Sequence, residues 1–159
     1  MKQQFDTLII GSGLAGLTIA LQIADHKKVC IVSKREVSDS ASSWAQGGIA
    51  AVLNSEVNNQ DSIEAHIQDT LVAGAGLCDV EITRNVATHA REAIEWLINQ
   101  GVEFTREADN KALHLTREGG HSQRRIVHAA DATGREVQKT LAQKIREQKH
   151  HYFRKSHCG

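Results

Sequence analysis

The sequence predicts an α/β fold that opens with one βαβ unit, and three consecutive segments indicate it. FDTLII at 5–10 is continuously apolar, which is typical of a strand buried on both faces. A glycine-marked turn follows and leads into an apolar helix over 14–24. KVCIVSK at 28–34 then predicts a second buried strand. Strand, tight turn, helix and strand within about thirty residues make a βαβ unit with a right-handed crossover.

The turn after the first strand carries the pattern G-x-G-x-x-G. In a Rossmann-like fold the first glycine permits the tight turn, the second lets the backbone approach a pyrophosphate, and the third lets the helix pack on the strand. The helix N-terminus offers unpaired N–H groups to the anion. The alternative is a tight strand-to-helix turn without a ligand, but pattern and context together favour a dinucleotide site. Its residues are Gly11, Ser12, Gly13, Leu14, Ala15 and Gly16.

The second strand ends in Ser33 and Lys34, where a NAD-binding domain usually places an acidic residue for the ribose. An ordinary NAD site is therefore disfavoured. Lys34 either neutralises a phosphate or bonds a ribose, or it is a solvated lysine at the end of a strand. The sequence leaves both interpretations open.

Three further helices are predicted from capping residues, after a Ser-, Ala-, Gly- and Asn-rich loop over 37–60. The first begins with a capping box of Asp61 and Glu64 and is closed by Gly74 or Gly76. The second runs from Asp79 to a stop at Gly101, and the third opens with a capping box of Thr133 and Glu136. Apolar spacing predicts the inward face of each helix. These faces carry Ile63, Ile67 and Leu71 in the first helix, Ile82, Val86, Ala90, Ala93, Leu97 and Ile98 in the second, and Val137, Leu141 and Ile145 in the third.

A hairpin is predicted from 102–105 and 112–115, turning around Asp109-Asn110. LHLTREGGHSQRRIVHAADATG at 113–134 has neither helical nor strand period, so a loop of this length is either disordered or functional. The last stretch, KHHYFRKSHCG, follows no pattern where a core strand should stand. We therefore expect 1–148 to be the amino-terminal part of an incomplete α/β domain with helical and hairpin insertions, and 149–159 to be an aberrant or truncated tail.

Length and composition limit the class of protein. At 159 residues the chain is one domain or a piece of a larger one. Its 19 Lys and Arg balance 19 Asp and Glu, so no net field draws it to nucleic acid or to a membrane surface. Cys30, Cys78 and Cys158 form no CxxC pair, which favours a cytoplasmic protein without a disulfide framework. The apolar stretch 8–24 contains three glycines and no cleavage pattern, so we expect neither a signal peptide nor a membrane span.

Several polar side chains are candidates for chemistry. In SSWAQGGIAAV at 42–52, two glycines free the backbone to lie against a flat ring system, although composition alone indicates only a glycine turn. The histidines at 114, 121 and 128 match no metal-binding spacing, so no metal site is expected. Arg124 and Arg125 either grip a carboxylate bidentately or pair with Glu107 or Asp131.

In this order, GSGLAG, SK, AQGGIAAV, DTLVAGAGLCD and HLTREGGHS-RRI-HAADATGRE make the chain similar to the amino-terminal part of the L-aspartate oxidases. That family lies within the succinate dehydrogenase and fumarate reductase flavoprotein superfamily. The resemblance runs from about Asp6 to about Lys144. It implies a Rossmann-like FAD-binding domain in which the TREGGH segment lies at the substrate and the flavin ring.

The resemblance also implies roles for individual residues. Those from Ser12 to Ala15 would meet the FAD pyrophosphate, and Lys34 would lie near the adenosine ribose. Glu118 would be the catalytic carboxylate that orients the substrate amino group, because an α-ammonium in a dry site needs a fixed anion. The residues that would line the flavin are Ala41, Ser42, Ser43, Trp44, Ala45, Gln46, Gly47 and Gly48.

The activity implied is the FAD-dependent oxidation of L-aspartate to iminoaspartate with oxygen or fumarate as acceptor, the first step toward quinolinate and NAD. Quinolinate synthase is then a candidate protein partner. FAD would be held non-covalently, because no histidine stands between His26 and His66, where dehydrogenase and fumarate reductase subunits usually bear the one that bonds the flavin. Such a subunit is the first alternative. The second is a truncated or frameshifted remnant, inactive alone, since proteins of this family are much longer.

Overall fold

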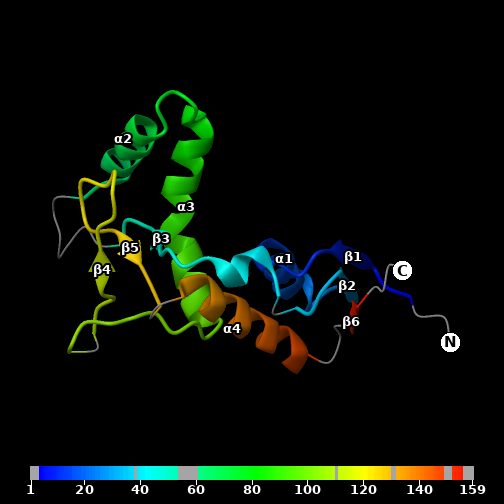
Figure 1. Cartoon of the computed structure of the whole chain (residues 1–159). Coiled ribbons are helices and arrows are strands. Elements are labelled where there is room, and N and C mark those ends of the chain that lie inside the picture. The colour runs from blue at the N-terminus through cyan, green and yellow to red at the C-terminus, as the bar shows by residue number, and fades with distance from the viewer. Residues whose placement is uncertain are drawn as a thin grey trace. The chain divides into compact units, whose positions relative to one another are not determined.

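The computed structural model describes residues 4–37, 39–53, 61–109, 111–129 and 132–148, and the backbone of Tyr152–Lys155 (Figure 1). The chain divides into two compact units. The first comprises Met1–Gln46, Gln100–Val102 and Ala132–Gly159, and the second comprises Gly47–Asn99 and Glu103–Asp131.

The first unit is built on a parallel sheet of three strands in the order β1-β2-β6. β1 (Thr7–Ile10) pairs with β2 (Val29–Ser33), and α1 (Leu14–Ile23) connects them. The predicted βαβ unit is therefore confirmed, with each element one or two residues shorter than the sequence indicated.

β6 (Tyr152–Lys155) adds the third strand, in the stretch where we expected an aberrant or truncated tail. Its backbone runs parallel to β2, with Tyr152 opposite Cys30 and Lys155 opposite Ser33. A strand thus stands where α/β topology requires one, although the sequence shows no pattern there. The domain boundary expected after residue 148 stays a prediction.

The core of the first unit lies where α4 (Thr133–Glu147) packs on α1. Its predicted inward residues Val137, Leu141 and Ile145 are all buried, as are Leu17 and Ala20 of α1. The predicted capping box at Thr133 is wrong, because the N-cap is Ala132 and no side chain caps the helix. The helix start is held by a tertiary contact instead, since the N–H of Gly134 donates to the carbonyl of Ala45 at 3.0 Å.

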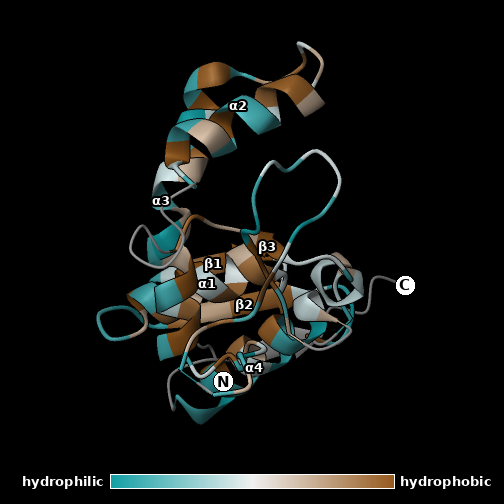
Figure 2. Cartoon of the chain, turned by 90° about the vertical axis from the view of Figure 1, so that its left-hand side faces the viewer, coloured by the Kyte–Doolittle hydropathy of each residue, from teal (hydrophilic) through white to brown (hydrophobic). Residues whose placement is uncertain are grey.

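β1 is not buried on both faces, contrary to the prediction. Ile9 lies against Gly16 of α1, whereas Leu8 and Ile10 are 60% and 85% exposed. In Figure 2, β1, β2 and α1 are predominantly brown, so the strand is apolar on a face that no described element covers.

The second unit combines two packed helices with a small antiparallel sheet in the order β3-β5-β4. β5 (Ile126–Val127) lies between β3 (Ile49–Ala50) and β4 (Leu115–Thr116). β4 and β5 belong to the segment 113–134, so this segment contains a hairpin that its lack of period concealed. The hairpin predicted from 102–105 and 112–115 is found in short form around a bridge between Arg106 and Leu113, flanked by backbone hydrogen bonds from Glu107 N to the Ala112 carbonyl and from His114 N to the Thr105 carbonyl. Asn110 of its predicted turn lies outside the described residues.

The helix starts in this unit test two predicted caps. α2 (Ile63–Ala73) is capped by Ser62, whose hydroxyl accepts from Ala65 N at 3.0 Å, rather than by Asp61. Asp61 is not available because its carboxylate binds Arg125. α3 (Val80–Asn99) begins as predicted, with Asp79 Oδ1 accepting from Ile82 N at 2.9 Å. The predicted closures are also found, since α2 ends at Gly74 and Gly101 follows α3 with φ +97°.

The inward face of α3 differs in part from the predicted one, of which Ala90, Leu97 and Ile98 are half-buried. Its buried residues are Ala87 and Ile94, whereas Ile82 and Val86 are each 64% exposed and Ala93 is also exposed. Ile82, Val86 and Ala93 thus lie about 80–140° around the helix from the two buried residues. The apolar residues of α3 cover more than one face, so tertiary packing decides which one is buried; α2 packs on the helix, and Ile94 lies beside Leu53, Leu113 and Leu115.

Candidate functional site

The turn between β1 and α1 has the geometry of a dinucleotide site. Gly11 has φ +106°, a conformation that favours glycine, and its N–H donates to the Val32 carbonyl at 2.8 Å. A Cβ on Gly16 would overlap the Gly11 carbonyl oxygen, so helix and strand approach as closely as the pattern requires. Gly13 is the N-cap of α1 without a capping side chain. The N-terminus of α1 is therefore open toward the turn.

Ser12 is buried and fixes this turn from two sides. Its hydroxyl donates to Ser33 Oγ at 2.8 Å, and its carbonyl accepts from Gln138 Nε2 at 2.6 Å. Gln138 Nε2 also donates to the Val37 carbonyl at 2.7 Å. Sequence reasoning missed Gln138, although a polar residue beside the buried stripe of α4 is the kind of signal that could have found it.

The serine-rich segment contributes Ser42 to the same place. This segment forms the short 3₁₀ helix η1 (Ala41–Trp44). Ser43 Oγ donates to the carbonyl of Ser40, the N-cap residue, at 2.6 Å. Ser42 Oγ accepts from Leu14 N at 3.4 Å. The structure thus brings Ser42 to the N-terminus of α1.

The other predicted flavin residues are less closely connected to the turn. Trp44 is 71% exposed, and the side chains of Ala41, Ala45, Gln46 and Lys34 are also exposed. Gly47 and Gly48 belong to the second unit. Their roles toward the flavin stay predictions.

Gly48 stands directly before β3, and its lack of a side chain matters for packing. A Cβ there would overlap Ile126 Cγ2 and the Val127 carbonyl oxygen, whereas a Cβ on Gly47 would meet nothing within 4 Å. We expect Gly48→Ala to lower the free energy of unfolding by about 1–3 kcal/mol, because the β3–β5 pair must move apart. Gly47→Ala is the matched control and should be neutral or stabilising by up to about 1 kcal/mol. Urea unfolding followed by Trp96 fluorescence in a Trp44→Phe background measures both, and equal effects would contradict the expectation.

Glu118 lies in the loop 117–125 that joins β4 to β5. Its carbonyl accepts from His121 N at 3.2 Å, and Gly120 takes φ +86° in this turn, as the third residue of a type II turn must. The second glycine of TREGGH is thus explained by a tight turn, and the Glu118 side chain at its start is exposed.

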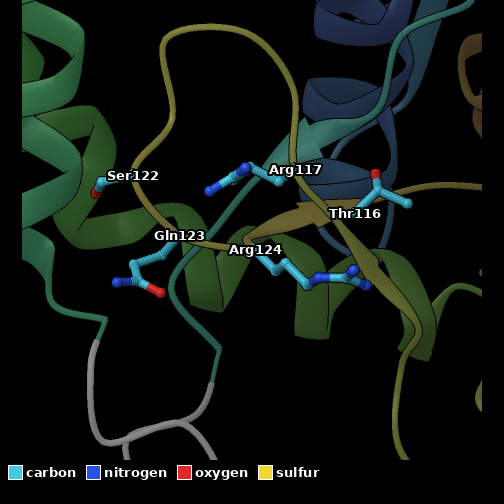
Figure 3. Close-up of a pocket in the computed structure, with 5 residues that line it drawn as sticks. All are labelled: Thr116, Arg117, Ser122, Gln123 and Arg124. Carbon is cyan, nitrogen blue, oxygen red and sulfur yellow. The ribbon is translucent and has the colours of Figure 1, made fainter.

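A pocket of about 640 Å³ opens beside this turn (Figure 3). It is lined by Thr116, Arg117, Ser122, Gln123 and Arg124. Within the described ranges neither arginine of the lining is paired with a carboxylate. Two guanidinium groups with hydroxyl and amide neighbours suit an anionic ligand.

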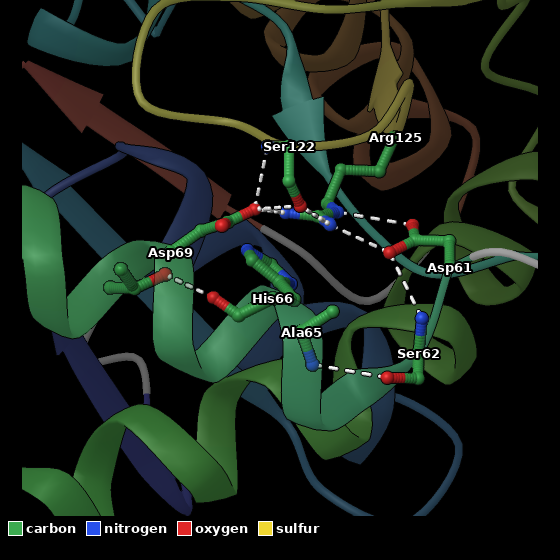
Figure 4. Close-up of polar contacts among 8 residues, drawn as sticks. Asp61, Ser62, Ala65, His66, Asp69, Ser122 and Arg125 are labelled. Carbon is green, nitrogen blue, oxygen red and sulfur yellow. Dashed lines mark hydrogen bonds and ion pairs between the residues drawn. The ribbon is translucent and has the colours of Figure 1, made fainter.

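Arg125 behaves differently from its neighbour Arg124. It is fully buried, and its guanidinium lies between two carboxylates (Figure 4). Nε and Nη2 donate to Asp61 at 3.0 and 2.6 Å, and Nη1 donates to Asp69 Oδ2 at 2.6 Å. Of the two functions left open for the arginine pair, Arg125 thus has the ion-pairing one, with Asp61 and Asp69 rather than the predicted Glu107. Asp131, the other predicted partner, lies outside the described residues.

The charges of this cluster stabilise one another. The pKa of Asp69 is held well below its usual range, mainly by the Ser122 backbone N–H and then, against burial, by the Arg125 guanidinium. Burial acts to lower the pKa of Arg125, but the hydrogen bonds and charges of Asp61 and Asp69 raise it. The ion pairs therefore persist at neutral pH.

Two histidine pairs accompany the loop. His66 of α2 and His121 form an edge-to-face pair with ring centroids 5.8 Å apart, and His114 Nδ1 lies 2.9 Å from His128 Nε2. In the part of the chain that the structure describes, no three His, Cys, Asp or Glu side chains gather as metal ligands would.

His66 gives the second unit a pH-dependent stability. Its pKa is lowered by burial, then by the charge of Arg125 and by His121. The unfolded chain therefore takes up a proton that the folded chain resists, and stability falls as pH drops below about 6.5. We expect His66→Phe to flatten the dependence of unfolding free energy on pH between about 7 and 5. Urea unfolding at several pH values measures the slope, and the same slope in His66→Phe and in the unsubstituted chain would contradict the expectation.

Among the described residues no helix is long and apolar enough to cross a membrane. A parallel sheet with a glycine turn at a helix N-terminus defines a dinucleotide-binding α/β domain. The family model described as "FAD binding domain" matches residues 6–158, and the chain therefore belongs to this family. The predicted fold and the predicted cofactor, FAD, are thereby confirmed.

Comparison with individual proteins indicates a narrower group than the family model does. The chain is 58% identical over 143 residues to L-aspartate oxidase 1 of Ralstonia nicotianae, covering 89% of this chain and 26% of the relative. It is 54% identical over 144 residues to the L-aspartate oxidase of Vibrio cholerae, covering 88% and 26%. A solved structure of the E. coli quinol fumarate reductase FrdA is similar with a TM-score of 0.84 at 30% identity, covering 95% and 26%. The chain spans about a quarter of the length of these relatives.

The residues present fit FAD. The N–H groups in the first turn of α1 have no acceptor within the helix, and Gly13 presents no side chain to a group lying against them. The residues that would hold the pyrophosphate are therefore those of the turn, with the Ser42 hydroxyl beside them.

Proposed function

We propose that the chain is the amino-terminal part of an FAD-dependent L-aspartate oxidase, which oxidises L-aspartate to iminoaspartate. The observation that carries the proposal is the 58% identity to an L-aspartate oxidase over nearly the whole chain. The dinucleotide turn and the arginine-lined pocket beside Glu118 support it, because the reaction needs both a flavin and an anionic substrate.

Bound FAD would supply the two-electron redox chemistry. The chain's own residues bind and orient. The Glu118 carboxylate accepts hydrogen bonds from the substrate ammonium group. It lies at the start of a tight glycine turn, where it is exposed to the ligand. Arg117 and Arg124 give the neighbouring pocket the positive charge that a dicarboxylate requires.

The remaining parts of the proposal follow from that activity. Oxygen or fumarate is the electron acceptor, the product enters NAD biosynthesis, and quinolinate synthase is the partner that consumes it in the cytoplasm. FAD is held non-covalently, because no histidine stands between His26 and His66 to form a bond to the flavin.

A succinate dehydrogenase or fumarate reductase flavoprotein subunit is the second candidate, favoured by the likeness to the fumarate reductase structure. Its 30% identity is well below the 58% identity to an L-aspartate oxidase. The missing histidine also argues against it.

The test is a chimera in which this chain replaces the aligned 143-residue segment of the Ralstonia nicotianae relative. We expect peroxide release with L-aspartate, and FAD that acid precipitation releases into the supernatant. Turnover of succinate but not aspartate, or flavin that stays with the acid-denatured pellet, would favour the dehydrogenase candidate instead.

A further inference from the structure

One face of α2 contacts the loop that carries Glu118. His66, Asp69 and Ala73 lie on the same side of the helix, at positions i, i+3 and i+7. The His66 ring packs against His121, Asp69 binds Ser122, and a Cβ on Gly120 would lie 3.4 Å from Ala73 Cβ. The turn that follows Glu118 is therefore docked on α2.

Asp69 makes the polar part of this contact with a single oxygen. Its Oδ2 accepts from Ser122 N and from Ser122 Oγ, both at 2.7 Å, and from Arg125 Nη1 at 2.6 Å (Figure 4). Ser122 lines the pocket and lies four residues after Glu118. A backbone N–H held by a carboxylate fixes the path of the chain at that residue.

The orientation of Asp69 is not explained by its ion pair with Arg125 alone. Asp61 already binds the guanidinium with both of its oxygens, at 3.0 and 2.6 Å. Two of the three hydrogen bonds to Asp69 come from Ser122 rather than from Arg125. Asp69 is thus oriented as much toward the loop as toward the buried cation.

We propose that Asp69 is a positioning residue, which holds the loop 117–125 through Ser122 and Arg125 in the conformation that presents Glu118 to the substrate. The proposal rests on the proposed function for the role of Glu118. The fixation of the loop itself rests only on the contacts of Asp69.

Hydrogen exchange on the chain tests the fixation without any activity. Asp69→Asn removes the charge while keeping the shape, and should speed amide exchange in 118–124 on the order of tenfold, the effect of losing one charged hydrogen bond. Asp79→Asn makes the same change at the exposed cap of α3, where Asn caps equally well, and should leave this loop unchanged. Should Asp69→Asn not fold, Ser122→Ala keeps the Arg125 ion pairs and should also speed exchange in the loop. Unchanged exchange in the folded variant would overturn the proposal.

Kinetics of the chimera test the consequence for the substrate. Asp69→Asn should raise KM for L-aspartate on the order of tenfold, with kcat and FAD content nearly unchanged, because the interaction is lost from ground and transition states alike. In a Glu118→Gln background the same change should have little further effect on KM. The positioning role would be overturned if Asp79→Asn raised KM for L-aspartate equally. It would also be overturned if Asp69→Asn raised KM as much in the Glu118→Gln background as in the unsubstituted chimera. A chimera without aspartate turnover would refute the proposed function, whereas the exchange experiment would still decide whether Asp69 holds the loop.

Discussion

Arg125→Ala should lower the free energy of unfolding of the second unit by about 3–5 kcal/mol, because it leaves two carboxylates without their cation in a buried site. The side chains of Asp61 and Asp69 are only 5% and 17% exposed. Neither carboxylate can be hydrated unless α2 or the loop 117–125 moves. Urea unfolding in a Trp44→Phe background measures this, since Trp96 then reports on the second unit alone.

Arg91→Ala is the matched control. It removes an arginine from a 3.0 Å ion pair with Glu95 on the surface of α3, where both side chains are more than half exposed. Such a pair contributes about 0.3–0.5 kcal/mol. If the two variants lost similar stability, the Arg125 cluster would be no more than a surface ion pair, and the docking of the loop on α2 would lose its main support.

The fold was predictable where it depends on neighbouring residues. The turn at Gly11 and the apolar stripe of α4 are local patterns, and both are confirmed. The inward face of α3 was not predictable, because its apolar residues surround much of the helix and only tertiary packing decides between them. The start of α4 was likewise set by a contact with Ala45, which no capping pattern near Thr133 encodes.

The candidate site also combines residues that the sequence predicts with residues that it does not predict. Residues of the dinucleotide turn follow from a short motif, and the role of Glu118 follows from resemblance. The pairing of Arg125 could not be predicted, since Asp61 and Asp69 are 64 and 56 residues away in sequence. The local pattern left Arg124 and Arg125 equivalent. Only the folded hairpin places Arg124 at the pocket and Arg125 inside the unit.

Glu118→Gln in the chimera should reduce kcat/KM for L-aspartate by about 30- to 140-fold, equivalent to the loss of a charged hydrogen bond of about 2–3 kcal/mol. Glutamine keeps the shape of the side chain and removes the anion that the substrate ammonium requires. Fumarate has no ammonium group, so its reduction should fall much less. Peroxide release with aspartate, and reoxidation of a reduced dye by fumarate, measure the two activities.

Glu103→Gln supplies the control for a general loss of charge, because Glu103 is another exposed carboxylate of the second unit and lies outside the hairpin loop. It should leave both activities within about twofold, as surface substitutions usually do. Equal losses for aspartate and fumarate in Glu118→Gln would mean that the carboxylate acts on the flavin or on the fold rather than on the ammonium group. A selective loss for aspartate would place the substrate amino group beside Glu118, with the arginine-lined pocket left to bind the carboxylates.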